Sequence, residues 1–210
     1  MLDASHRADP FDPDSIDDPL AQQTSWDPAA PGGTNIQSHR LQRTSDTRVS
    51  FVATGSARAF SVGFFLIGAF VTLLGIAGVV AADASMTPLI LIGLAFAAFG
   101  TLSWRSMATP RTFDRELGAY WRGAGTPTDI EHAPDHVSLE EIHALQIITE
   151  RLSIRTKHGT RRFTSHELNL VLLDGHRVNV TDHVHGAALR ADAAALADFL
   201  GGVPVWDASA

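Results

Sequence analysis

The residues best suited to chemistry lie near position 183, where two histidines and an aspartate fall close together. His183 and His185 flank one residue, and Asp182 precedes them. Two imidazoles and a carboxylate at the end of a strand suit zinc and other transition metals. This triplet is therefore a candidate site for a metal-dependent, membrane-bound enzyme, and further histidines add to it: His132, His136 and His143. Because the chain holds ten histidines, such a group also arises by chance, and the competing interpretation is a surface turn in which His183 caps a strand.

Asp182 has a second candidate role as the partner of His166. In the hairpin register predicted below, the two residues lie opposite each other. They would make an acid/base pair or, as we favour, a structural cross-strand contact. We assign no catalytic residue and no cofactor, because the sequence contains no glycine-rich phosphate loop, nucleophile elbow or HExxH helix.

A third candidate site is a local cluster of basic residues. It consists of Arg155, Lys157, Arg161 and Arg162. Each such charge contributes about 1 kcal/mol to binding when it lies close to anionic lipid headgroups. The cluster would contact lipid or a partner protein, and the alternative is ordinary surface charge.

Charge is unevenly distributed along the 210 residues, whose net charge is −7. Residues 1–59 and 105–210 each carry a net charge of −3, whereas residues 60–104 hold a single charged side chain, Asp83. The chain is thus a polar tail, an apolar block and a polar domain. Its acidic balance argues against nucleic acid as a partner. The absence of cysteine excludes a disulfide scaffold and thiolate chemistry.

The apolar block predicts two membrane spans, at residues 60–82 and 88–104. A helix of the first length is about 34 Å long, enough for a hydrocarbon core of about 30 Å. We expect a helical hairpin in the lipid bilayer, the alternative being a hairpin buried in a soluble core. Small residues would let the helices pack closely or would form a dimer face in a homo-oligomer: Gly68, Gly75, Gly78, Gly93, Ala97 and Gly100. Neither span holds an ionisable side chain, which argues against a transporter or channel.

Arginine placement predicts the orientation of the hairpin. Four arginines precede the first span from Arg40 to Arg58, three follow the second from Arg105 to Arg115, and the connecting loop has none. The positive-inside rule then places both termini in the cytoplasm. We see no signal peptide. Arginine outnumbers lysine fifteen to one, which suggests a bacterial genome rich in G and C and hence the bacterial inner membrane.

The N-terminal tail, residues 1–46, is acidic and rich in proline. It shows no helical or strand period, so we expect it to be disordered. An alternative is a tether that docks on a partner through Phe11, Ile16 or Trp26. Residues 47–58 then predict a strand just before the membrane, which could pair with strands that follow the second span.

The polar domain, residues 109–206, reads as an antiparallel β-domain closed by one helix. Hairpins are predicted over 109–123 and 166–181. A three-residue loop that ends at a left-handed Gly175 pairs Leu172 with His176, Leu170 with Val178 and Leu168 with Val180, which gives one apolar face. Residues 138–155 fit either a capped helix or a turn followed by a strand, and we favour the strand. Residues 187–200 predict the closing helix, after which Val203, Val205 and Trp206 fold back on the sheet.

Three stretches carry a family resemblance: FDRELGAYWRG after the hairpin, LEEIHALQIITE, and ALADFLGGVPVW near the end. They resemble membrane-anchored bacterial proteins with a cytoplasmic PH-like domain of unassigned function, and more distantly the two-span photosystem I assembly factors. The resemblance covers residues 48–206 and omits the acidic tail. It implies an α+β membrane protein in which a two-helix hairpin joins a PH-like domain. It further implies a non-enzymatic scaffold or assembly role, with another membrane protein or complex as partner.

Overall fold

The chain divides into two compact units in the computed structural model, which describes residues 4–8, 11–32, 37–81, 83–156 and 159–209. One unit is Ala53–Thr109, and the other joins Met1–Val52 to Pro110–Ala210. This division follows the charge pattern, because the first unit holds the two apolar runs.

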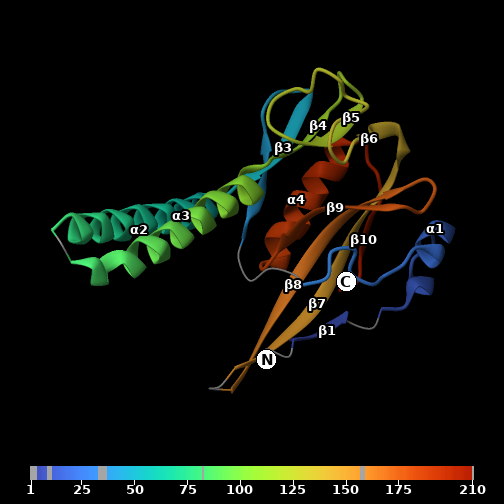
Figure 1. The fold of residues 1–210 in the computed structure, drawn as a ribbon. Coiled ribbons are helices and arrows are strands. Elements are labelled where there is room, and N and C mark those ends of the chain that lie inside the picture. Colours follow the sequence, from blue (N-terminus) through green and yellow to red (C-terminus); the bar gives the residue numbers. More distant parts are fainter. Residues whose placement is uncertain (1–3, 9–10, 33–36, 82, 157–158, 210) are drawn as a thin grey trace. The chain divides into compact units, whose positions relative to one another are not determined.

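The apolar unit is a pair of antiparallel helices, α2 (Gly55–Val80) and α3 (Thr87–Ala108), joined by the short helix η2 (Ala84–Met86) (Figure 1). Both helices are long and apolar enough to cross a membrane, and only 11% of the most apolar window of each is buried. The predicted helical hairpin is therefore confirmed. Helix α2 begins earlier than expected because the Thr54 hydroxyl accepts a hydrogen bond from the Ala57 N–H at 3.3 Å. Residues 55–58, assigned to a strand over 47–58, are helical.

One five-stranded sheet of the larger unit has the order β2-β3-β4-β5-β6. Its strands are β2 (His39–Arg43), β3 (Arg48–Ala53), β4 (Arg111–Asp114), β5 (Ala119–Arg122) and β6 (Val137–Ser138). β3 and β4 are antiparallel neighbours, with Val49 opposite Phe113. The apolar hairpin is thus inserted between two adjacent strands of one sheet, as the sequence predicted.

The second sheet has the order β1-β7-β8-β9, with β10 beside β7. Its strands are β1 (Ala4–Ala8), β7 (Ile142–Thr156), β8 (Gly159–Leu172), β9 (Arg177–His183) and β10 (Val205–Asp207). The ambiguous stretch after Ser138 is a short 3-10 turn, η3 (Leu139–Glu141), followed by the strand β7. The strand interpretation was correct because this segment pairs on both edges and alternates its buried side chains between two covered faces.

The hairpin of β8 and β9 confirms only part of the predicted register. Gly175 adopts φ of +82°, the Leu172 N–H donates to the His176 carbonyl at 2.9 Å, and Leu170 lies opposite Val178. A β-bulge then inserts Val180 as an extra residue, so that Leu168 pairs with Thr181 instead. The bulge turns both Leu168 and Val180 into the core, where each is fully buried.

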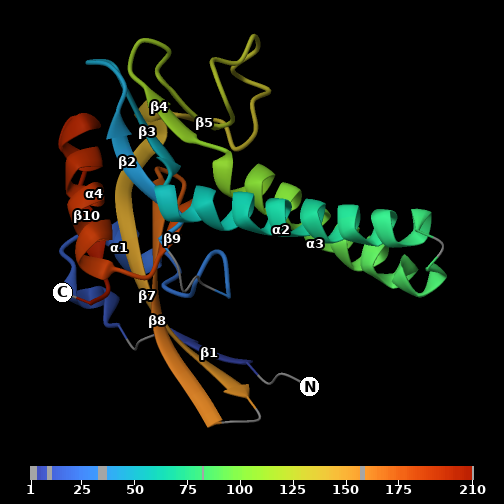
Figure 2. The same cartoon turned by 90° about the vertical axis from the view of Figure 1, so that its left-hand side faces the viewer.

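One hydrophobic core lies between the two sheets and helix α4 (Gly186–Phe199) (Figure 2). The sheets contribute large buried side chains, among them Phe51, Phe113 and Leu170, and α4 adds Leu189 and Leu196. Gly201, with φ of +93°, follows the last helical turn, and Trp206 returns to the second sheet as predicted. The fold is α+β with antiparallel sheets.

The expectation of a disordered tail over residues 1–46 is corrected where the structure describes it. β1 pairs with β7, and residues 11–32 form η1 (Pro13–Ser15) and α1 (Pro19–Gln23). Asp12 and Asp18 each cap one of these helices, and the proline after each aspartate occupies the first helical position. The pairs Asp12-Pro13 and Asp18-Pro19 are therefore helix starts. The few apolar residues of the segment, Ile16, Leu20, Ala21 and Trp26, pack against Ala144, Val171 and Trp206.

Candidate functional site

The three proposed metal ligands do not converge. Asp182 lies on the polar face of the sheet, where its carboxylate accepts a hydrogen bond from Asn179 at 3.2 Å. His183 is fully buried, and its Nδ1 accepts a hydrogen bond from the His185 N–H at 2.9 Å. His185 is exposed and precedes α4. Over the residues that the structure describes, no group of three or more His, Asp or Glu side chains is placed to hold a metal ion.

The bulge at Val180 also changes the partner of Asp182. Position 166 lies opposite His183, and Asp182 lies opposite Glu167. The predicted pairing of Asp182 with His166 is therefore wrong by one residue. Instead, His166 Nδ1 lies 2.9 Å from the Thr149 hydroxyl. Burial, reinforced by the negative charge of Glu167, raises the pKa of Asp182 to about 6.

The basic cluster is described only in part. Lys157 lies outside the described residues, and the backbones of Arg155 and Arg161 pair with Thr160 and Ile154 at the outer end of β7 and β8. Arg162 is exposed. Lipid or partner contact through these residues remains a prediction.

The small residues of α2 and α3 occupy the contact between the two helices. A Cβ atom added at Gly68 would meet the Ala97 backbone nitrogen at 2.3 Å, and one at Gly100 would meet the Phe65 nitrogen at 2.5 Å. One at Gly93 would meet the Thr72 hydroxyl at 2.4 Å. Gly75 and Gly78 make similar close approaches to Ile90 and Met86. These residues pack this hairpin, because only glycine lets the backbones come so close.

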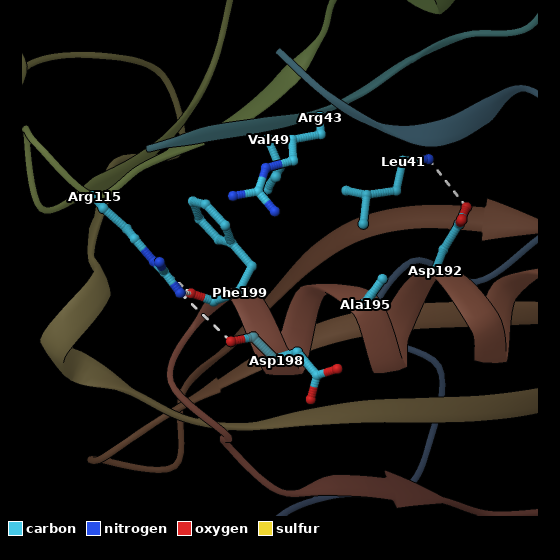
Figure 3. Close-up of a pocket in the computed structure, with 8 residues that line it drawn as sticks. All are labelled: Leu41, Arg43, Val49, Arg115, Asp192, Ala195, Asp198 and Phe199. Carbon is cyan, nitrogen blue, oxygen red and sulfur yellow. Dashed lines mark hydrogen bonds between the residues drawn. The ribbon is translucent and has the colours of Figure 1, made fainter. Parts of the chain in front are cut away.

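A groove between β2 and α4, which the sequence did not predict, could receive a partner (Figure 3). Its volume is about 440 Å³. Leu41, Val49, Ala195 and Phe199 supply its apolar lining. Its charged residues have opposite signs on the two sides. Arg43 comes from β2 and Arg115 from the turn between β4 and β5, whereas Asp192 and Asp198 come from α4.

Two hydrogen bonds fix the ends of this groove. At one end, Asp192 accepts the Leu41 N–H at 3.0 Å, which ties edge strand β2 to the helix (Figure 3). Burial raises the pKa of Asp192. At the other end, Arg115 Nε donates to the Phe199 carbonyl at 2.6 Å, and its guanidinium lies 4.3 Å from the Phe199 ring centroid. Arg115 thereby satisfies a C-terminal carbonyl of α4 that the helix itself leaves free.

The groove combines an apolar lining with two arginines on one side and two aspartates on the other. An amphipathic segment of another protein could bury its apolar side chains and place charges at both rims. The sequence signal was the helix face over 187–200, but the facing strand, residues 39–43, lay in the segment expected to be disordered.

Comparison with known proteins adds no relative: no family model matches the chain, and no curated protein matches it.

Proposed function

We propose that this chain is an integral membrane protein of the bacterial inner membrane whose cytoplasmic PH-like domain binds another membrane protein, as a non-enzymatic scaffold or assembly subunit. The observation that carries the proposal is the insertion of an apolar helical hairpin between the adjacent strands β3 and β4. A domain whose sheet continues directly into two membrane spans is held at the membrane surface by short connections at both ends.

Exposure of the hairpin supports its insertion in lipid. Leu66, Leu73 and Leu91 are 59%, 64% and 67% exposed, and most large side chains of both helices are similarly uncovered. Soluble monomeric proteins rarely expose apolar patches larger than a few hundred Å². A bilayer covers such a surface, and arginines flank the spans but are absent from the loop between them.

The architecture of the larger unit supports the PH-like assignment. Two antiparallel sheets enclose a core that one C-terminal helix closes. Such folds serve many functions, so the role must be argued from a site. The groove of β2 and α4 is the site best suited to a protein partner, because its charged rims would align a segment of complementary charge and its apolar lining would bind the segment's side chains.

Site-specific photo-crosslinking in native membranes tests the proposal. A photoreactive amino acid at Ala195, which lines the groove and is exposed, should give a discrete crosslinked product with another membrane protein. The matched control is Ala194, which is exposed on the same helix but about 100° away around its axis. The substitution Ala195→Arg should abolish partner recovery from detergent extracts while leaving the protein folded.

The proposal fails if the probe at Ala195 gives no product beyond those seen at Ala194. It also fails if Ala195→Arg recovers the same proteins as the wild type at native expression.

A further inference from the structure

The outer halves of β7 and β8 continue past β9 as a ribbon (Figure 2). β9 pairs only with residues 166–171 of β8, whereas β7 and β8 stay paired as far as Thr156 and Gly159. β1 lies along the other edge of β7, opposite residues 150–154. One face of this three-stranded ribbon has a hollow of about 480 Å³. We propose that the hollow is a binding site for phosphate groups.

Arginine and hydroxyl side chains alternate around the hollow. Arg151 on β7 lies opposite Thr164 on β8, and the next pair on the same face is Ser153 with Arg162. All four residues line the hollow. The two arginines are therefore diagonal neighbours, which in an antiparallel sheet lie about 7–8 Å apart. Two guanidinium groups on side chains of this length can both reach a single tetrahedral anion between them.

The two faces of the ribbon differ in character. Leu152 and Phe163 lie opposite each other and belong to the second face by alternation, where Leu152 is 3% exposed. On the face with the hollow, the two arginines are exposed and the two hydroxyl residues are half-buried. Protein–protein interfaces usually contain an apolar core, which this face lacks. The hollow is therefore better suited to a small, highly charged group than to a protein surface.

Positive charge is concentrated on this face, in a chain whose net charge is −7. The register adds two arginine positions, since Arg7 lies opposite Arg151 and Arg155 lies opposite Thr160. The face then has eight positions, of which four are arginine, four are serine or threonine and none is acidic: Ser5, Arg7, Arg151, Ser153, Arg155, Thr160, Arg162 and Thr164. Like charges at neighbouring positions of a sheet repel each other. An anion bound between them would remove that repulsion.

Phosphate matches this set of donors better than a carboxylate does. A guanidinium group donates two parallel hydrogen bonds to a phosphate, and serine and threonine hydroxyls also donate to phosphate oxygens. A phosphate has enough oxygens to accept from two arginines and a hydroxyl at once, whereas a carboxylate has only two. The phosphate could belong to a lipid headgroup or to a soluble phosphorylated molecule. The structure also divides the predicted basic cluster, because position 162 falls on this face and position 161 on the other.

Calorimetry on the full chain in a neutral detergent can measure binding with two probes. Glycerol phosphate is a soluble phosphate monoester, and dihexanoyl phosphatidic acid carries the same group on a lipid. Arg162→Gln should weaken binding of the phosphate probes by about tenfold or more, because it removes a charged fork of donors. Arg162→Lys should restore only part of the affinity, since the ammonium group keeps the charge but lacks the fork. Arg161→Gln removes the same charge at the adjacent position on the other face, and this matched control should leave binding unchanged.

The two probes also identify the source of the phosphate. Binding of phosphatidic acid about tenfold or more tighter than that of glycerol phosphate would assign a lipid headgroup, and similar affinities would assign a soluble molecule. The proposal is overturned if neither probe binds, or if Arg161→Gln weakens binding as much as Arg162→Gln. It is also overturned if glutamate binds as tightly as glycerol phosphate at the same ionic strength, because the face would then attract any anion. None of these readouts involves the groove of β2 and α4 or a partner protein, so they stand apart from the test of the proposed function.

Discussion

Glu167 lies directly opposite Asp182 across the β8–β9 pair, so that two carboxylates share one covered face of the sheet. The bulge at Val180 creates this pairing by shifting every later residue of β9 by one position. Three charged groups act on the pair: Arg111 on β4, Glu150 on β7, and Arg177 on β9 itself. Burial and the charge of Glu167 together raise the pKa of Asp182 to about 6.

Replacing Asp182 by Asn should therefore stabilise the protein at neutral pH. Between the ordinary pKa of 3.8 and the raised value of about 6, the folded state holds a proton that the unfolded state has lost. Wild-type stability thus falls through this group as the pH rises across that window. We expect Asp182→Asn to raise the free energy of unfolding by about 1–3 kcal/mol at pH 7.5 and by much less at pH 4. Thermal melts at both pH values measure this, and an equal difference at both would contradict it.

Asp114→Asn should have the opposite effect. Asp114 is 1% exposed, and one of its oxygens accepts Arg48 Nε at 2.6 Å while the other accepts the N–H groups of Glu116 and Leu117. Burial alone would raise the pKa of Asp114, but the hydrogen bonds from Leu117, Arg48 and Glu116 outweigh it and lower the pKa. We expect a loss of about 2–4 kcal/mol at pH 7.

The loss of stability caused by Asp114→Asn should shrink at low pH, because the wild-type carboxylate then takes up a proton. The decrease begins below the pKa of Asp114 in the unfolded state and continues as the pH falls through its lowered pKa in the folded state. The control is Asp129→Asn, since Asp129 is exposed and pairs only with the exposed His132 in the described contacts. Its melting temperature should match that of the wild type at every pH. A pH-independent effect of Asp114→Asn would refute the assigned ion pair.

Gly68→Ala should weaken the helical hairpin, because the new methyl group would meet the Ala97 backbone at 2.3 Å. Overpacking of this kind costs about 1–3 kcal/mol. Gly63 is the matched control on the same helix, since a Cβ there meets no atom within 4 Å. Gly63→Ala should leave stability unchanged or raise it slightly, because alanine favours the helix. Melting of both variants in the same detergent distinguishes them, and equal melting temperatures would contradict the close packing at Gly68.

Arg115→Leu should loosen the last turn of α4. The side chain donates to the Phe199 carbonyl and stacks on the Phe199 ring. Its loss should cost about 1–2 kcal/mol. Amide exchange of residues 197–200 should quicken while that of β8 changes less. Arg43→Ala removes the other arginine of the groove. It should neither lower the stability nor quicken this exchange, because Arg43 pairs with Asp46 at an exposed turn.

Local signals in the sequence were sufficient for most elements of the fold. Gly175 closes the β8–β9 turn with a positive φ, and the apolar face around Leu189 and Leu196 identified α4. The run Ile147-Ile148-Thr149 favoured a strand over the capped helix, and β7 contains it. In each case a local conformational preference and a buried apolar face predicted the same element.

Features that depend on distant contacts could not be predicted in this way. The tail has too few apolar residues to fold alone, and it is ordered through partners such as Glu167 and Trp206, more than a hundred positions away in the sequence. The bulge at Val180 follows from core packing against Leu168. The α4 groove needed strand β2, which was taken as part of the disordered tail, so only its helical side had a local signal.

We propose that α2 and α3 cross the bacterial inner membrane and hold the β-domain in the cytoplasm. The chain has no cysteine, so single cysteines report topology without background. Ser85→Cys lies in the loop between the helices, and Ala194→Cys lies on the exposed side of α4. In a bacterial host, a membrane-impermeant maleimide should label position 85 in intact spheroplasts and position 194 only after lysis. Labelling of both positions only after lysis, with the chain released by alkaline carbonate, would contradict the claim.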